Sequence, residues 1–210
     1  MNNELKKRII SSLVLVPITF FFIIKGSHLF IIFLTAMCLV SINEWLKMCK
    51  KNLIKILGVL FLFLSFYSAF SIREYSGLYF FLFIILLCVF TDIGGYVFGK
   101  LFKGPKLSKL SPKKTYSGVL GGLSFALIAG FLYLKFIEIT FLKLDNFLLL
   151  FVILIISLIS QIGDLIISYF KRKADIKDTG NILPGHGGLL DRIDGIIFVL
   201  PIVYIKIFIL

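Results

Sequence analysis

The sequence predicts an all-α fold, a polytopic integral membrane bundle of about seven transmembrane helices. Of its 210 residues, 59% are hydrophobic, and the mean hydropathy is +1.03. Both values place the chain in the membrane class. The apolar residues gather into runs that approach the ~20 residues a helix needs to cross ~30 Å of hydrocarbon. Short charged or glycine-containing loops separate these runs. The runs cover residues 9–24, 29–46, 54–72, 77–98, 118–137, 146–170 and 193–210.

The first run follows a basic cluster, as the apolar part of a signal peptide would. Residues 6–8 are Lys-Lys-Arg, and the run after them is long for a signal peptide. The segment that follows, Lys25-Gly26-Ser27-His28, is a poor cleavage site. We therefore expect an uncleaved first span.

Positive charge is concentrated in alternate loops. The net charge is +12, and the basic segments are the N-terminus and the loops after the second, fourth and sixth runs. Because basic loops remain in the cytoplasm, we expect these segments on the cytoplasmic side and the C-terminus outside. The basic residues lie in short loops between membrane runs, so no nucleic-acid partner is expected. The most basic loop contains six lysines: Lys100, Lys103, Lys106, Lys109, Lys113 and Lys114.

Four carboxylates are predicted to converge near the cytoplasmic face. Asp92 and Asp164 each lie about six residues before the inner end of an apolar run, and Asp191 and Asp194 open the last run from the same side. Asp191 and Asp194 are three residues apart, so they share one face of a helix. A carboxylate within the membrane is costly and normally faces a cavity, a partner or an ion.

Each of these carboxylates also has a purely structural interpretation. Asp92 could equally pair with a lysine of the basic loop. Asp164 follows a glycine that allows close backbone approach, which favours an ion site. Asp191 and Asp194 flank Arg192 and, taken alone, would form an ion pair at a helix start. With Asp164 nearby, metal binding becomes the better interpretation.

The stretch from residue 168 to 194 is too rich in charge and glycine to lie in lipid, so it must lie at the surface or line a wet cavity. Its cations, its glycine-rich turn and its carboxylates suit phosphate groups and a divalent metal. His186 stands in a Pro-Gly-His-Gly-Gly turn and could bind a phosphate, donate a proton or only shape the turn. The cations are Lys171, Arg172, Lys173, Lys177 and Arg192.

A second polar segment precedes the fifth run. Pro112 stiffens a turn, and Lys113, Lys114 and Thr115 follow it. Three glycines then open the run, as in a helix start that is closely packed or faces a phosphate. In the alternative interpretation the lysines only set the topology. The glycines are Gly118, Gly121 and Gly122.

The stretch at 168–194 resembles the signature of the phosphatidate cytidylyltransferases, also called CDP-diacylglycerol synthases. The agreement spans 27 positions with fixed spacing, so chance agreement is very improbable. The matching residues are Ser168, Phe170, Lys171, Arg172, Lys177, Asp178, Gly180, His186, Gly187, Gly188, Leu189, Asp191, Arg192, Ile193 and Asp194.

Further matches lie upstream, so the resemblance covers the C-terminal ~120 residues. They are Gln161-Ile-Gly-Asp164, Asp92-Ile-Gly-Gly-Tyr96 followed by Gly99-Lys100, and Ser111-Pro-Lys-Lys-Thr115. The N-terminal part agrees only in being hydrophobic with a basic start. We therefore divide the single membrane unit into N-terminal helices (1–76) and a catalytic region (77–210). One departure stands out, because Ser117 occupies a position where family members usually have Glu.

The resemblance implies a nucleotidyltransferase that makes CDP-diacylglycerol and diphosphate from CTP and phosphatidate, for phospholipid biosynthesis. It implies Mg²⁺ held by Asp164 and Asp191, with Asp92 as an additional candidate. It also implies a bacterial-type inner (cell) membrane location with the active site on the cytoplasmic face; a homodimer remains open. The implied catalytic residues are Asp164, Asp191, Asp194, Lys171 and Arg172. The implied substrate-binding residues are Lys113, Lys114, Thr115, Lys177, Asp178, His186, Gly187, Gly188 and Arg192.

Two alternatives remain at this point. A CTP-dependent lipid kinase of the polyprenol type would transfer the γ-phosphoryl group to an alcohol and release CDP. A cation or proton transporter built around Asp92 and Asp164 is also compatible with seven spans, although it has no need for so many phosphate-type donors at one face.

Overall fold

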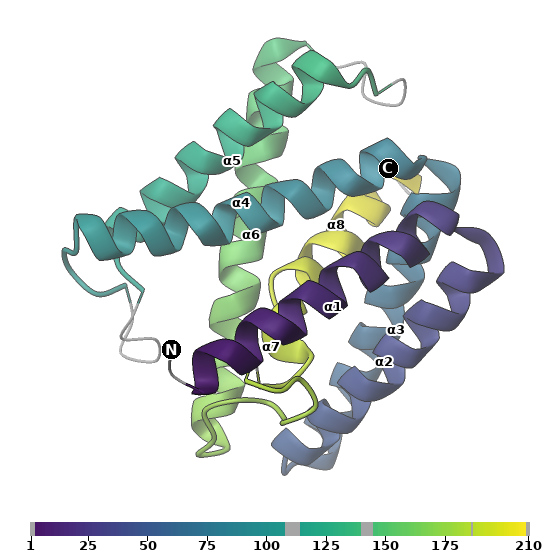
Figure 1. The fold of residues 1–210 in the computed structure, drawn as a ribbon, viewed down its shortest axis with the longest axis vertical. Helices are drawn as coiled ribbons and strands as arrows, with labels where there is room; N and C mark the ends of the chain where they lie inside the picture. Colours follow the sequence, from purple (N-terminus) through teal and green to yellow (C-terminus); the bar gives the residue numbers. More distant parts are fainter. Residues whose placement is uncertain (1–2, 108–113, 140–144, 186, 209–210) are drawn as a thin grey trace.

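The structure is a computed structural model of the 210-residue chain and describes residues 3–107, 114–139, 145–185 and 187–208. Its described secondary structure is helical apart from two isolated β-bridges. Figure 1 shows the order and packing of the helices. They are α1 (Asn3–Lys25), α2 (Ser27–Met48), α3 (Asn52–Tyr75), α4 (Leu78–Leu101), α5 (Tyr116–Phe136), α6 (Asn146–Lys173), α7 (Leu190–Ile193) and α8 (Ile196–Phe208).

The helices confirm a polytopic helical membrane protein. Five of them, α2 to α6, are long and apolar enough to cross a membrane. The apolar parts of the other two predicted spans are shorter, Ser11–Lys25 in α1 and Ile196–Ile207 in α8. The number of seven crossings and the side on which the N-terminus lies therefore stay predictions.

Two helix boundaries differ from the sequence-based expectation in a way that matters for the site. Helices α4 and α6 continue to Leu101 and Lys173, beyond the expected ends at 98 and 170. The last helix, α8, begins at Ile196 rather than at 193, and a separate single turn, α7, ends at Ile193. The break falls at Gly195, where a side chain would overlap Ser160 of α6. The glycine therefore lets the chain pass α6 closely as it enters α8.

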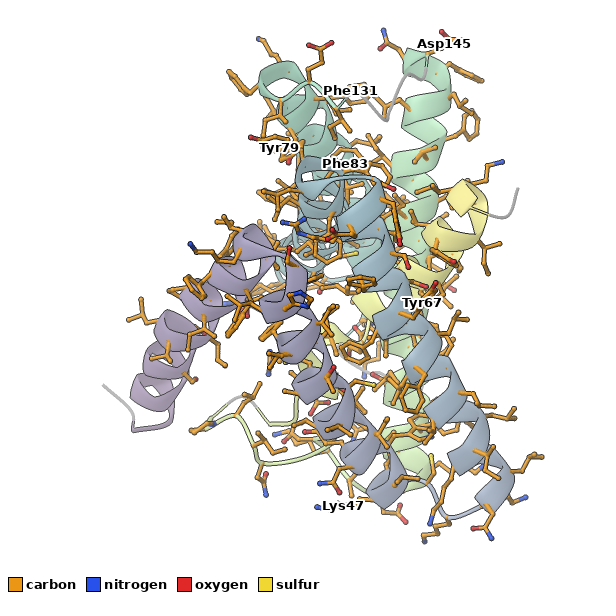
Figure 2. The ribbon with its side chains drawn as sticks, turned by 90° about the vertical axis from the view of Figure 1, so that its right-hand side faces the viewer. Lys47, Tyr67, Tyr79, Phe83, Phe131 and Asp145 are labelled. Carbon is orange, nitrogen blue, oxygen red and sulfur yellow. The ribbon has the colours of Figure 1, made fainter. Side chains whose placement is uncertain are left out.

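The helices form two connected groups. Figure 1 shows α4 crossing α6, with α5 beside α4, while α2 and α3 form a hairpin next to α8. Figure 2 shows α1 diverging from α2 after the sharp turn at their junction. That turn needs Gly26, whose φ is +64°, and Arg73 of α3 donates to the carbonyls of Ile23 and Ile24 at 3.0 and 3.2 Å. The arginine thus ties the end of α1 to α3.

The glycines of α4 and α5 allow the two backbones to touch. A side chain on Gly94 or Gly121 would overlap the other helix, and a Cβ on Gly118 would lie 2.8 Å from the carbonyl oxygen of Gly95. Close packing of this kind is typical of small residues between membrane helices. The interpretation of Gly118, Gly121 and Gly122 as a closely packed helix start is therefore confirmed, and all three are buried.

A second, smaller core lies beneath the 168–194 stretch. It joins α2, α3, α6, α7 and α8 through Trp45, Leu62, Ile167, Leu190 and Ile197. Trp45 is 7% exposed, and its indole N–H donates to the carbonyl of Ile54 at 3.2 Å. The stretch therefore rests on a packed apolar base to which the N-terminal helices contribute.

The α4–α5 contact can be tested with two alanine substitutions. Gly121→Ala should lower the free energy of unfolding by about 1–3 kcal/mol, because the new methyl group overlaps Phe98 and the two helices must separate. Gly95→Ala is the matched control, since its Cβ would lie at an ordinary 3.6 Å from its nearest neighbour. Thermal unfolding of the purified protein in detergent measures both. Equal stability of the two variants would contradict the close packing.

Candidate active site

A cavity of about 250 Å³ opens between α4, the start of α5 and α6. Its polar lining comes from the three upstream segments that match the family signature, around residues 92–96, 111–115 and 161–164. Asp92 and Tyr96 project from α4, Lys114 and Thr115 precede α5, and Asp164 comes from α6. The cavity therefore unites segments that lie far apart in the chain.

Asp164 is the central carboxylate of this cavity. The Nζ of Lys114 lies 2.5 Å from its Oδ2 and 3.4 Å from the carbonyl oxygen of Gln161. Ser168, one turn later on α6, donates to the Oδ1 of Asp164 at 3.3 Å. The basic loop and α6 are thus joined directly by an ion pair whose two side chains are each about one-quarter exposed (25% and 28%).

Asp194, between α7 and α8, lies against Asp164. The two side chains interact through a hydrogen bond and through their charges. Two carboxyl groups in contact repel each other when both are charged, so a cation or a shared proton is needed to stabilise them side by side. Asp92 lines the same cavity as Asp164 and Lys114, whereas Asp194 reaches the site through its contact with Asp164.

These residues fit a hard divalent cation such as Mg²⁺. Carboxylate oxygens are suitable ligands, and Mg²⁺ usually takes only one or two carboxylates and completes its shell with water or phosphate oxygens. Within the described parts of the chain, no three His, Cys, Asp or Glu side chains are grouped so as to hold a metal. A cation here would therefore share its coordination with substrate or water.

Asp191 has a different set of partners. Its Oδ1 lies 2.7 Å from the Nζ of Lys171. Its Oδ2 accepts from the N–H of Thr179 at 2.7 Å and the N–H of Gly188 at 3.0 Å, and it lies 3.1 Å from the hydroxyl of Thr179. Burial opposes the charged form, but the hydrogen bonds from Lys171, Thr179 and Gly188 hold the pKa of Asp191 below its ordinary value. Asp191 and Asp194, predicted to share one helix face, therefore have different partners: Asp191 binds Lys171 and Asp194 lies against Asp164.

The loop between α6 and α7, residues 174–189, is folded back on Asp191. Gly187 has a φ of +86°, and a Cβ there would lie 3.0 Å from the side chains of Asp178 and Asp191. The N–H of Leu183 donates to the carbonyl of Gly187 at 3.0 Å. Only glycine satisfies both the backbone conformation and the available space at 187.

The remaining predicted cations lie at the outer side of this loop. Lys177 and Arg192 are exposed, as is the neighbouring carboxylate of Asp178, and Arg172 donates to the carbonyl of Ile176 at 3.4 Å. The three cationic positions, but not Asp178, suit contact with a polyanion. Lys113 and His186 lie outside the described residues, so their predicted roles remain untested.

Thr115 and Ser117 organise the start of α5. The Thr115 hydroxyl accepts from the N–H of Gly118 at 3.1 Å, which caps the helix. The Ser117 hydroxyl lies 2.9 Å from that of Thr115 and donates to the carbonyl of Lys103. Where Glu is usual, this chain therefore has a short side chain that closes the basic loop.

One residue close to the site was missed by the sequence analysis. Glu44 of α2 is 2% exposed. It accepts hydrogen bonds from Thr179 and Leu189 of the loop before α7 and from Leu190, the first residue of α7. A lone carboxylate near the end of an apolar run is the signal that could have found it, because such a group normally needs a partner.

Comparison with known proteins gives a consistent result. Residues 53–210 match the model of the cytidylyltransferase family. The chain is 44% identical over 144 residues to proteins named phosphatidate cytidylyltransferase from Staphylococcus haemolyticus and Staphylococcus aureus (strain COL), covering 68% of this chain and 53% of each relative. The chain thus spans about half the length of these curated relatives.

A relative from Rickettsia bellii, also named phosphatidate cytidylyltransferase, is 36% identical over 214 residues, covering 96% of this chain and 90% of the relative. The family match covers the cavity, Asp164, the loop before α7 and Asp191. This chain belongs to the cytidylyltransferase family.

Proposed function

We propose that this protein is a phosphatidate cytidylyltransferase, which converts CTP and phosphatidate into CDP-diacylglycerol and diphosphate. The observation that carries the proposal is the ion pair between Lys114 and Asp164. It brings the basic loop onto α6, beside a cavity and next to a loop rich in N–H donors and cations. The names of the relatives support the same reaction.

The chemistry requires two polyanions to approach each other. A phosphate oxygen of phosphatidate forms a bond to the α-phosphorus of CTP, and the bond from that phosphorus to the bridging oxygen breaks, so diphosphate leaves. The lipid phosphate has a second pKa near ~6, so it is largely ionised and needs no strong general base. The protein must chiefly neutralise charge and orient the reactants. We propose that Lys114 and Lys171 bind the inner phosphates, and that Arg172, Lys177 and Arg192 bind the outer ones.

Mg²⁺ bound here would neutralise phosphate charge and stabilise the leaving diphosphate. Asp164 and Asp191 are the proposed ligands, with Asp92 and Asp194 beside Asp164. In this structure the Oδ1 of Asp191 is bound to Lys171, so Lys171 and a metal would compete for that oxygen. The binding of a metal by Asp191 and the position of Lys171, a proposed phosphate ligand, would therefore depend on each other.

The function is tested with the purified full chain, phosphatidate, labelled CTP and Mg²⁺. Expected products are a lipid that carries the cytidine nucleotide and free diphosphate in equal amounts. Release of CDP with phosphorylation of a lipid alcohol would instead establish a lipid kinase. Cation flux into liposomes without CTP would indicate a transporter, and both outcomes would overturn the proposal.

Asp164→Asn and Asp191→Asn should each reduce turnover by at least about 100-fold while the protein stays folded, and the double variant should be little worse than either one. Residues that act as one unit are non-additive. Asp175→Asn is the control, because Asp175 is exposed with φ of +58°, a conformation that Asn tolerates. Initial rates over a Mg²⁺ titration measure the effect. Near-normal Mg²⁺-dependent turnover of Asp164→Asn would exclude the proposed metal site.

Lys114→Ala should raise the KM for CTP more than that for phosphatidate, by roughly 1–3 kcal/mol of binding free energy, because a charged contact to a phosphate is lost. Lys106→Ala, in the same loop with an exposed side chain, should change neither value. Steady-state kinetics with each substrate varied measure both. An equal loss for the two substrates would assign Lys114 a general structural role.

We also infer that the site faces the cytoplasm, the compartment that supplies CTP. The motivation is the alternation of basic and near-neutral loops. Lys103→Cys should react with a membrane-impermeant thiol reagent only from the cytoplasmic side, and Asp145→Cys only from outside. The native Cys38, Cys49 and Cys88 are buried, so background labelling should be low. Labelling of Asp145→Cys from the cytoplasmic side would overturn this topology.

A further inference from the structure

We propose that Glu44 of α2 is a positioning residue of the active site, whose carboxylate holds both ends of the 179–190 segment so that Asp191 is correctly presented. The inference rests on the proposed function for its kinetic part only. It assigns a role to a residue that lies outside the 53–210 region matched by the family model.

Three donors from the segment converge on the Glu44 carboxylate. The N–H of Leu189 donates to Oε1 at 2.8 Å. The N–H of Leu190 and the hydroxyl of Thr179 donate to Oε2, each at 2.9 Å. Thr179 stands at the beginning of the segment and Leu190 at its end, so one side chain from α2 fastens both.

The same contacts lead directly to Asp191. The hydroxyl of Thr179 lies between the two acids, 2.9 Å from Glu44 Oε2 and 3.1 Å from Asp191 Oδ2. Leu190, whose N–H is held by Glu44, is the residue immediately before Asp191. A displacement of Glu44 should therefore move Asp191 through two contacts, one with Thr179 and one with Leu190.

Two glycines of the segment, Gly180 and Gly188, lie so close to this carboxylate that a side chain on either would overlap it. A Cβ on Gly180 would lie 2.7 Å from Oε1 of Glu44 and 3.2 Å from its Cδ, and a Cβ on Gly188 would lie 2.6 Å from its Oε2. Both positions belong to the motif that the sequence singled out, one as its small residue and one as the second glycine of His-Gly-Gly. The Glu44 carboxylate therefore accounts for the small size of Gly180, and it limits the space at Gly188 together with the Thr179 hydroxyl, which a Cβ at 188 would overlap.

The donors around Glu44 explain why a carboxylate stands at this buried position. The side chain is 2% exposed and its neighbours Trp45 and Met48 belong to an apolar core. Burying a carboxylate costs free energy, but an apolar residue of similar volume would leave the buried N–H groups of Leu189 and Leu190 without this acceptor, which is also costly. The carboxylate supplies several acceptor sites to three donors at once, which an apolar side chain cannot.

The first test compares Glu44→Gln and Glu44→Asp with Glu74→Gln, a remote control whose carboxylate is 40% exposed beside Arg73. Hydrogen–deuterium exchange of the full-length protein, without substrate, reports on the Leu189 and Leu190 amides. We expect exchange at least 10-fold faster in Glu44→Gln and an intermediate rate in Glu44→Asp. In the CDP-diacylglycerol assay we expect kcat to fall by about 10- to 100-fold, the range for groups that orient a ligand, with KM for both substrates within about 3-fold. A merely structural role would not separate kcat from KM in this way.

The second test is a double-mutant cycle between Glu44 and Gly180. Gly180→Ala alone should lower kcat at least 10-fold, because its methyl group displaces the Glu44 carboxylate. In a Glu44→Ala background the same change should cost less than about 3-fold, since the space is then empty. Independent, multiplicative effects would show that the contact does not operate and would overturn the inference.

The outcomes separate this inference from the proposed function. If wild-type protein makes no CDP-diacylglycerol, the function is wrong, and the exchange rates alone decide whether Glu44 holds the segment. If wild-type protein is active but Glu44→Gln changes neither exchange nor kcat, the function stands and the positioning role is wrong. Should Glu44→Gln fail to fold, the Glu44→Asp and Gly180→Ala variants carry the same comparison.

Discussion

The buried carboxylate of Asp191 is the group on which the arrangement of the site depends. It is bound by one lysine of α6 and by donors from both sides of the loop before α7. A carboxylate removed from water must be paired and hydrogen-bonded. The loop supplies these hydrogen bonds only when it folds back over the end of α6. The depressed pKa that these donors produce keeps Asp191 charged, and the charge in turn maintains the contacts.

A second constraint acts through backbone packing. Helices α4 and α5 approach closely because glycines occupy their contact, and this places Asp92 and Lys114 over α6. Lys114 then reaches Asp164, which already faces Asp194. The close contact of α4 and α5 therefore brings Asp92 and Lys114 to the cavity that Asp164 of α6 also lines. The pairing of Lys114 with Asp164 therefore depends on the glycine contacts that hold α5 against α4.

The N-terminal helices are more than a membrane anchor. Glu44 and Trp45, consecutive residues of α2, meet the loop before α7 and the end of α6 respectively, and Ser11 of α1 donates to the carbonyl of Pro184 at 3.1 Å. The N-terminal helices, whose family resemblance is weak, thus contact the loop before α7 and the end of α6, which belong to the stretch with the strongest resemblance.

Length, hydropathy and spacing were sufficient to determine the helical membrane class, the seven apolar segments and the residues of the motif. Those properties are local, because a helix in lipid must satisfy its own backbone and a motif is defined by positions along one chain. Which acids share a cavity was decided only by the tertiary structure. Asp191 and Asp194 lie three residues apart, yet one binds Lys171 and the other lies against Asp164. The role of Glu44 also depends on contacts across more than 130 positions of sequence, and no local pattern specifies a partner at that distance.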